Sequence, residues 1–188
     1  MSDAGGRVKP LGPTDVKRLN REWRRRTEGR VTLLLDGVQQ PFNVGAIVRT
    51  AAALRVEHLY LSGGTASLSL AKVGKVSLGT ERYLTWSEHE TLAEAIDAVK
   101  DEGHRLVAIE LASGAVPLHE VVMGPDVCLA VGHEDHGLSA LTLAAADAVA
   151  FVPQLGRVGS LNVATAASLA MYEARRRAWG AGPPNFVE

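Results

Sequence analysis

Hydrophobic and polar positions alternate along this chain in blocks, with short apolar runs separated by segments of helical period. Apolar runs of strand length fall at residues 30–38, 56–63, 104–111, 126–132 and 148–153, with a shorter candidate strand at 82–86. Helical spacing separates these runs at residues 43–54, 65–75, 91–103, 137–147 and 161–179. Continuous apolar runs are typical of strands buried on both faces. The pattern therefore predicts an α/β fold, a mostly parallel sheet flanked by helices.

The length of 188 residues favours one domain with a short appendage. The chain has one cysteine, Cys128, inside the apolar run "DVCLAVG", where a buried strand residue is expected. A lone cysteine forms no internal disulfide, which fits a reducing compartment. Apolar runs of transmembrane length are absent, and the first fifteen residues lack the apolar core of a secretory signal. We therefore expect a cytoplasmic protein that does not enter a membrane.

Charge is distributed unevenly, although the net charge is only −1. Residues 17–30 hold seven Lys or Arg and two Glu, a local charge of +5. Thr14 is expected to cap a helix that continues to Arg26, with Leu19 and Trp23 on its apolar face. Two interpretations follow: a surface helix docked through these two residues, or a helix whose arginines contact phosphates. We divide the chain accordingly into an N-terminal arm with a basic helix, 1–29, and a main domain, 30–188.

Three polar, glycine-containing loops follow predicted strands, at the edge of a parallel sheet where ligands bind. Their sequences are "DGVQQPFNVGAIVRT", "GHEDHGLS" and "PQLGRVGSLNV". The chain lacks G-x-x-x-x-G-K-[ST], G-x-G-x-x-G and G-x-S-x-G, which argues against a P-loop, a Rossmann dinucleotide site and a nucleophile elbow. "HEDH" is not H-E-x-x-H and has no further Cys or His nearby, so we predict no metal site.

Taken singly, the polar residues of these loops allow structural interpretations as well as functional ones. Ser160 and Asn162 in "GSLN" suit a helix cap, and Asn43 suits another. Arg49 in "VGAIVRTAAAL" suits an ordinary surface position on an amphipathic helix, and Glu134 suits a surface carboxylate. The residues alone do not decide between these roles and ligand contact.

Taken together, the three loops resemble the SpoU (TrmH) family of RNA ribose 2′-O-methyltransferases, within the SPOUT superfamily. The family's motifs are matched in order by "PFNVGAIVRTAAAL", "LAVGHEDHGLS" and "FVPQLGRVGSLNVATAASLAMYE", over roughly residues 30–177. Two positions depart from the family pattern. His133 stands where Asn, Gln or Ala is frequent, and Ala164 stands where Ser is usual, which bears on substrate detail more than on the reaction.

The resemblance implies a SPOUT-type fold with a C-terminal trefoil knot, a homodimer, and S-adenosylmethionine as cofactor with no metal. The implied catalytic residues are Asn43, Arg49, Glu134, Ser160 and Asn162. The implied cofactor-binding residues are Ile109, Gly132, Val152, Gly156, Ser160 and Leu161. RNA contacts are expected from Arg21, Arg24, Arg25, Arg26 and Arg49.

Arginine is a poor base, because its pKa exceeds about 12. We therefore expect Arg49 to orient the target phosphate and ribose through a bidentate contact. The layout is most similar to the branch that methylates guanosine 18 in the tRNA D-loop; the tRNA wobble position and rRNA are alternatives. Two other classes stay open: a knotted RNA-binding protein without catalysis, and an unrelated α/β nucleotide-binding enzyme.

Overall fold

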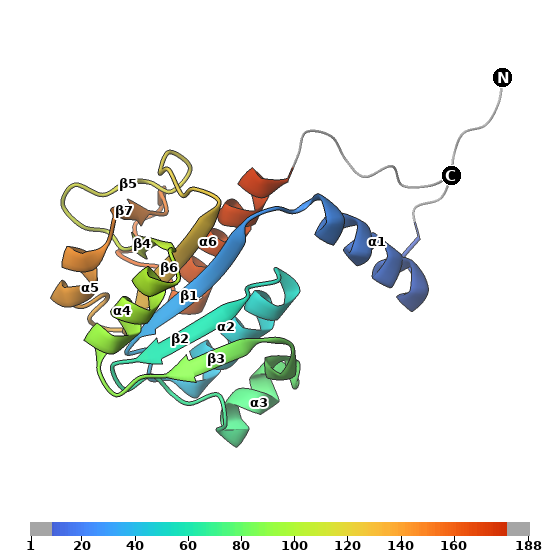
Figure 1. Cartoon of the computed structure of the whole chain (residues 1–188), viewed down its shortest axis with the longest axis horizontal. Helices are drawn as coiled ribbons and strands as arrows, with labels where there is room; N and C mark the ends of the chain where they lie inside the picture. Colours follow the sequence, from blue (N-terminus) through green and yellow to red (C-terminus); the bar gives the residue numbers. More distant parts are fainter. Residues whose placement is uncertain (1–8, 180–188) are drawn as a thin grey trace.

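A seven-stranded sheet forms the centre of the computed structural model, which describes residues 9–179 (Figure 1). Its strands are β1 (Arg30–Asp36), β2 (His58–Ser62), β3 (Thr85–Glu88), β4 (Arg105–Ile109), β5 (Val116–Pro117), β6 (Asp126–Gly132) and β7 (Ala148–Phe151). Their order across the sheet is β3-β2-β1-β6-β4-β7-β5. Every neighbouring pair is parallel, which confirms the predicted α/β class.

Six α-helices and one 3-10 helix accompany the sheet within the described residues. They are α1 (Pro13–Arg26), α2 (Pro41–Ala53), α3 (Ala71–Ser77), η1 (Thr80–Tyr83), α4 (Leu92–Asp101), α5 (Ala140–Ala145) and α6 (Val163–Ala178). Helices α2, α3 and α6 pack on one face and α4 and α5 on the other. No helix within residues 9–179 is both long enough and apolar enough to cross a membrane.

Strand β1 shows why the sheet is buried on both faces. Leu33 and Leu35 belong to the core beneath α2 and α6, whereas Leu34 belongs to the core beneath α4, and all three are fully buried. Successive side chains of a strand point to opposite faces, so an unbroken apolar run fits two covered faces. Cys128 in β6 is also fully buried, as predicted, and burial raises the pKa of its thiol to about 12.

The strand register brings the chemically rich loops to one edge of the sheet. Asp36 at the end of β1 is level with Gly132 at the end of β6, and Ala108 of β4 is level with Ala130 of β6. The loops that follow β1, β4, β6 and β7 therefore start side by side. This is the carboxyl edge, where α2 and α6 also begin.

Several local expectations are corrected by the structure. Thr14 does not cap α1, which begins one residue earlier at Pro13 with Gly12 at the N-cap, because proline is pre-organised for the first helical turn. Helix α2 likewise begins at Pro41, so Asn43 lies inside the helix and is not its N-cap. The strand expected at 82–86 is displaced to β3, since residues 80–83 form η1. The two-residue strand β5 gave no detectable pattern.

Helix α6 lies on the same face of the sheet as α2, and hydrogen bonds fix both of its ends. At its start, the side chain of Asn162 caps the helix by accepting from the backbone N–H groups of Ala164 and Thr165 at 3.0 and 3.3 Å. At its other end, the buried guanidinium of Arg175 donates to the backbone oxygens of Gly29, Leu54 and Arg55. The hydrogen bonds of Arg175 hold the C-terminal end of α2 against α6.

Candidate active site at the carboxyl edge

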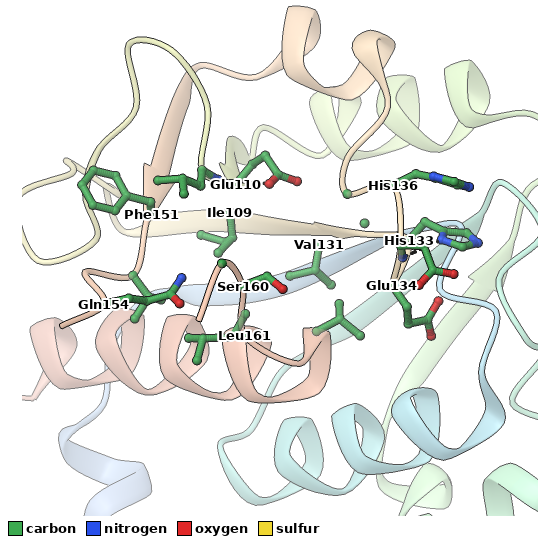
Figure 2. Close-up of a pocket in the computed structure, with 18 residues that line it drawn as sticks. Ile109, Glu110, Val131, His133, Glu134, His136, Phe151, Gln154, Ser160 and Leu161 are labelled. Carbon is green, nitrogen blue, oxygen red and sulfur yellow. Dashed lines mark hydrogen bonds between the residues drawn. The ribbon is translucent and has the colours of Figure 1, made fainter. Parts of the chain in front are cut away.

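A cavity of about 320 Å³ lies at the carboxyl edge of β4, β6 and β7, bounded by the loops that follow them and by the start of α6 (Figure 2). Of the six predicted cofactor-binding residues, five line it: Ile109, Gly132, Val152, Ser160 and Leu161. Gly156 lies in the same loop as Ser160 but is not among the lining residues. Lining residues that sequence reasoning missed include Glu110, His133, His136, Phe151 and Gln154.

The loop after β6 is held closed by its own backbone. His133 and Gly137 exchange two N–H to carbonyl hydrogen bonds of 2.9 Å each. A Cβ atom on Gly132 would lie only 2.3 Å from the carbonyl carbon and oxygen of Gly137, and 2.4 Å from the nitrogen of Leu138. Because these neighbours are backbone atoms, no side chain fits at Gly132. Glycine there lets the loop fold tightly over the end of β6.

Glu110, directly after β4, fastens the same loop from the neighbouring strand. Its Oε2 atom accepts from the backbone N–H of Leu138 at 2.9 Å. Its Oε1 atom accepts from the backbone N–H of Leu111 at 3.1 Å. The carboxylate also lies where a Cβ on Gly137 would be, at 2.3 Å from Oε2. Glu110 thus fixes the position of one wall of the cavity.

The cavity has an anionic end and a mostly apolar middle (Figure 2). Among the described residues that line it, the charged ones are the carboxylates Glu110, Glu134 and Asp135, and none is Lys or Arg. Figure 2 shows Ile109, Val131, Ser160 and Leu161 between the His133–His136 end and the Phe151–Gln154 end. The rings of His133 and His136 stack with centroids 4.7 Å apart. At the opposite end, Oε1 of Gln154 is buried and has no hydrogen-bond partner within residues 9–179.

Three predicted catalytic residues form one hydrogen-bonded chain. The amide nitrogen of Asn162 donates to Oδ1 of Asn43 at 3.0 Å, and Nδ2 of Asn43 donates to Glu134 Oε1 at 2.9 Å. Glu134 also accepts from the backbone N–H groups of Gln39 and Gln40 at 3.2 and 3.0 Å. Partial burial alone would raise the pKa of Glu134, but these donors outweigh it and lower that pKa. These side-chain hydrogen bonds therefore connect all three predicted sequence motifs.

Arg49 and the arginines of α1 lie outside this cavity. Arg49 is exposed on α2, six residues beyond Asn43, and its side chain makes no hydrogen bond or ion pair within residues 9–179. Arg21, Arg24 and Arg25 are exposed on α1, while the guanidinium of Arg26 lies 5.3 Å from the centre of the Trp23 ring. The single chain therefore assembles the predicted cofactor and loop residues but not the predicted arginines.

Comparison with known proteins matches residues 30–172 to the SpoU rRNA Methylase family. The chain belongs to this family. The tRNA (guanosine(18)-2'-O)-methyltransferase of Escherichia coli K12 is 31% identical over 173 residues, 92% of this chain and 74% of that protein. The 23S rRNA (guanosine(2553)-2'-O)-methyltransferase RlmP of Bacillus subtilis is 34% identical over 146 residues, 78% of this chain and 58% of that protein.

Solved structures of RNA-methylating proteins share the fold. An AdoMet-bound rRNA methyltransferase from Sinorhizobium meliloti has a TM-score of 0.76 at 29% identity, covering 82% of this chain and 59% of its own. A protein described for the 2-OH methylation of C/U34 on tRNA has a TM-score of 0.70 at 32% identity. The match covers 79% of this chain and 96% of that protein. The predicted family is thereby confirmed, although several relatives are considerably longer than this chain.

Proposed function

We propose that this protein is an S-adenosylmethionine-dependent RNA ribose 2′-O-methyltransferase that works in the cytoplasm. The observation that carries the proposal is the hydrogen-bonded chain of Glu134, Asn43 and Asn162 beside a cavity at the carboxyl edge. The relatives from E. coli and B. subtilis are named as guanosine 2′-O-methyltransferases of tRNA and of 23S rRNA. Family membership and the assembled motifs together favour an active enzyme over a knotted protein that only binds RNA.

The cavity's chemistry fits the cofactor. S-adenosylmethionine combines a purine nucleoside, a positively charged sulfonium and an amino acid. The apolar middle suits the nucleoside, and the carboxylates of Glu110, Glu134 and Asp135 suit a cationic ligand. The unpartnered Oε1 of Gln154 is a buried acceptor that a ligand donor would satisfy. When bound, S-adenosylmethionine supplies an activated methyl group.

The residues that would hold the cofactor lie at the ends of β4 and β6 and in the segment between β7 and α6. Ile109, Gly132, Val152 and Leu161 would contribute main-chain groups, and Gly156 and Ser160 belong to the same segment as Val152 and Leu161. Calorimetric titration with S-adenosylmethionine tests this assignment. Gln154→Ala should weaken binding, whereas Gln39→Ala, outside the cavity lining, should not. If wild-type protein binds no S-adenosylmethionine, the assignment of the cavity fails.

The proposed catalytic residues divide into two groups. Asn43, Glu134 and Asn162 position the loops around the site, and Ser160 offers a hydroxyl at the cavity wall. Arg49 would hold the phosphate next to the target ribose through two parallel N–H donors. Since an arginine with a pKa above about 12 does not readily take a proton, the 2′-hydroxyl would lose its proton to a phosphate oxygen or to water.

We propose a homodimer in which Arg49 of one subunit completes the cavity of the other. Two features support it: Arg49 has a free guanidinium outside its own cavity, and large apolar side chains on α2 and α6 are exposed. These are Phe42, Leu169 and Tyr172. Co-expressing Arg49→Ala and Ser160→Ala chains tests it, because each mixed dimer would contain one intact site. Recovery of activity is expected; a site built within one chain would give none.

The fold would carry a C-terminal trefoil knot. Helix α6 follows β7, near one side of the sheet, yet it packs against α2, β1 and β6 in the middle. The segment that leads into it therefore turns back across the carboxyl edge beside the loops after β4 and β6. Single-molecule stretching tests the knot. A knotted chain should stop short of the roughly 3.3–3.6 Å per residue of full extension, and an untied chain should reach it.

The N-terminal basic helix, within residues 1–29, would bind the RNA backbone. Arg21, Arg24 and Arg25 are exposed on α1, which buries none of its residues and stands apart from the sheet in Figure 1. Neutralising Arg24, Arg25 and Arg26 together should weaken RNA binding and flatten its salt dependence, with S-adenosylmethionine affinity unchanged. Unaltered RNA affinity in that triple variant would remove the role of the helix.

The proposed target is guanosine 18 in the D-loop of tRNA, as in the E. coli relative. The tRNA wobble nucleotide and rRNA are the competing targets, since relatives of similar identity act on each. Incubating unmodified tRNA transcripts and rRNA fragments with the protein, then mapping the methylated nucleotide, separates the three. Modification at nucleotide 34 or only in rRNA would overturn the D-loop assignment and keep the reaction.

A further inference from the structure

A second cavity, of about 850 Å³, lies where α1, the ends of α2 and α6, and η1 meet. Because α2 and α6 both start at the carboxyl edge and run back along the sheet, their ends place this cavity at the opposite edge from the first. The ten steps along α2 from Asn43 to Ala53 correspond to about 15 Å of helix. The two cavities are therefore separate sites on one face of the molecule.

The second cavity has a lining opposite in character to that of the first. Its aromatic residues are Trp23, Tyr83 and Trp179, and its charged residues are Arg24, Arg55 and Arg175. The described lining includes no Asp or Glu. Of the described residues that line the first cavity, three are carboxylates and none is Lys or Arg. Charge complementarity therefore directs a cationic ligand to the first cavity and an anionic, aromatic ligand to the second.

Of the three aromatic side chains Tyr83 is the most exposed, whereas Trp23 and Trp179 are half-buried and the guanidinium of Arg26 lies over the Trp23 ring. Trp23 and Trp179 have centroids 5.1 Å apart at an interplanar angle of 54°, so neither ring covers the other face to face. Tyr83 is 66% exposed, and the guanidinium of Arg82 lies 4.8 Å from its ring centre. Exposed aromatic rings beside arginines are the platforms on which unpaired bases stack.

The arginines supply both positive charge and unoccupied hydrogen-bond donors. Arg175 is 2% exposed, and its donors are used by three backbone oxygens; burial lowers its pKa, although the charge of Glu57 partly opposes that effect. The guanidinium groups of Arg24 and Arg55 are exposed and make no hydrogen bond or ion pair within residues 9–179. Their donors are free for a phosphate, which an arginine can bind in a bidentate manner.

Arg55 also adopts a backbone conformation that L-residues rarely adopt. Its φ angle is +55°, and its carbonyl accepts from the buried Arg175. A non-glycine residue in this region carries strain, which the surrounding structure must hold in place. Glycine would fit the backbone better, yet the residue here, at the cavity wall, is an arginine.

We propose that the second cavity binds an unpaired nucleotide of the RNA substrate, away from the ribose that is methylated. Its base would stack on Tyr83 and Trp23, and its phosphate would pair with Arg24 and Arg55. The inference rests on the proposed function, because it takes RNA as the substrate. It adds to that function a site that grips the RNA at the opposite edge of the sheet.

Tryptophan fluorescence tests the stacking directly, without using activity. The chain has three tryptophans, and Trp86 does not line the cavity. In a Trp86→Phe background, a single-stranded oligouridylate should quench the fluorescence of Trp23 and Trp179. An abasic strand of equal length and charge should quench little. Equal responses to the two strands, or no response at binding saturation, would overturn stacking in this cavity.

Two substitutions test whether the cavity itself binds RNA, as distinct from effects of overall charge or of misfolding. Tyr83→Leu should weaken oligouridylate binding about tenfold. Arg55→Gly should weaken it while the protein stays folded, because glycine relieves the positive φ angle. Leu78→Gly is the matched control, since Leu78 has a φ of +56° and carries no charge. Lys100→Gln, on α4 across the sheet, controls for loss of a surface cation.

Each failure has a distinct signature. If Arg55→Gly and Tyr83→Leu bind RNA as the Leu78→Gly and Lys100→Gln controls do, the cavity does not hold a nucleotide. If they instead change the sedimentation of the protein, a second copy occupies the cavity and the proposal is wrong. In both cases wild-type S-adenosylmethionine binding and methyl transfer to tRNA would persist. If the wild-type protein neither bound S-adenosylmethionine nor methylated tRNA, the proposed function itself would be wrong.

Discussion

Substituting Asn43 by alanine removes the residue that links the three motifs of the site through hydrogen bonds. Asn43 is 3% exposed and sits in α2 between Glu134 and Asn162, with one hydrogen bond to each. Alanine keeps the helix but removes both bonds. Glu134 then loses one of its three donors, and the amide nitrogen of Asn162 loses its acceptor.

The magnitude follows from the two bonds. A hydrogen bond to a charged group contributes roughly 1.5–3 kcal/mol and a neutral one about 1 kcal/mol. Their sum predicts a loss of about 3 kcal/mol in the free energy of unfolding. For a domain of this size, that corresponds to a fall in Tm of about 6–12 °C. Methyl transfer should fall at least tenfold, because the loop of Glu134 and the start of α6 are no longer tied together.

Thermal unfolding followed by circular dichroism measures the stability change at fixed protein concentration. Asn43→Asp is the companion variant, since it keeps the acceptor for Asn162 but sets a second carboxylate against Glu134. The two carboxylates raise each other's pKa, so the deficit of Asn43→Asp should be largest at pH 7 and shrink as pH falls through about 5. If Asn43→Ala unfolds within 1 °C of wild type and keeps full activity, the hydrogen-bonded chain carries neither stability nor function.

Three further predictions concern substitutions of single residues. Arg49→Lys keeps the charge but loses the planar fork, so methyl transfer should fall with stability unchanged; a wild-type rate would show that fork geometry is not needed. Gly132→Ala sets a Cβ 2.3 Å from backbone atoms of Gly137, so S-adenosylmethionine affinity measured by calorimetry should fall at least tenfold. Hydrogen bonds from Arg176 and then Arg177 lower the pKa of Glu173 to about 2. That stabilisation is complete above the unfolded pKa of about 4.5 and is lost towards pH 2. Glu173→Gln should therefore cost about 2 kcal/mol at pH 7 and little at pH 2 in urea titrations.

The central fold was predictable because local sequence and tertiary environment agree there. Strands β1 and β6 are unbroken apolar runs buried on both faces, and the helices between strands are marked by period and by polar ends. The edges were less predictable. Strand β5 has two residues, too few for a pattern, and η1 occupies part of an apparent strand. In both places pairing with a neighbour, rather than local preference, decides the structure.

The site was predictable as a set of motifs and less so as a geometry. Asn162 proved to be both a helix cap and the partner of Asn43, which no local pattern distinguishes. Glu110 was missed because it lay within a predicted strand, and its role depends on a loop 28 residues later. Gln154 was missed because a buried amide without a partner is visible only in three dimensions.

The most direct test of the proposed reaction is the transfer of a labelled methyl group from S-adenosylmethionine to unmodified tRNA. The product would then be treated with alkali, which cleaves RNA only where the 2′-hydroxyl is free. The proposal predicts label in the RNA and one alkali-resistant linkage, which is lost with Arg49→Ala. Label on a base with every linkage still cleaved, or no label despite bound S-adenosylmethionine and tRNA, would contradict a ribose 2′-O-methyltransferase.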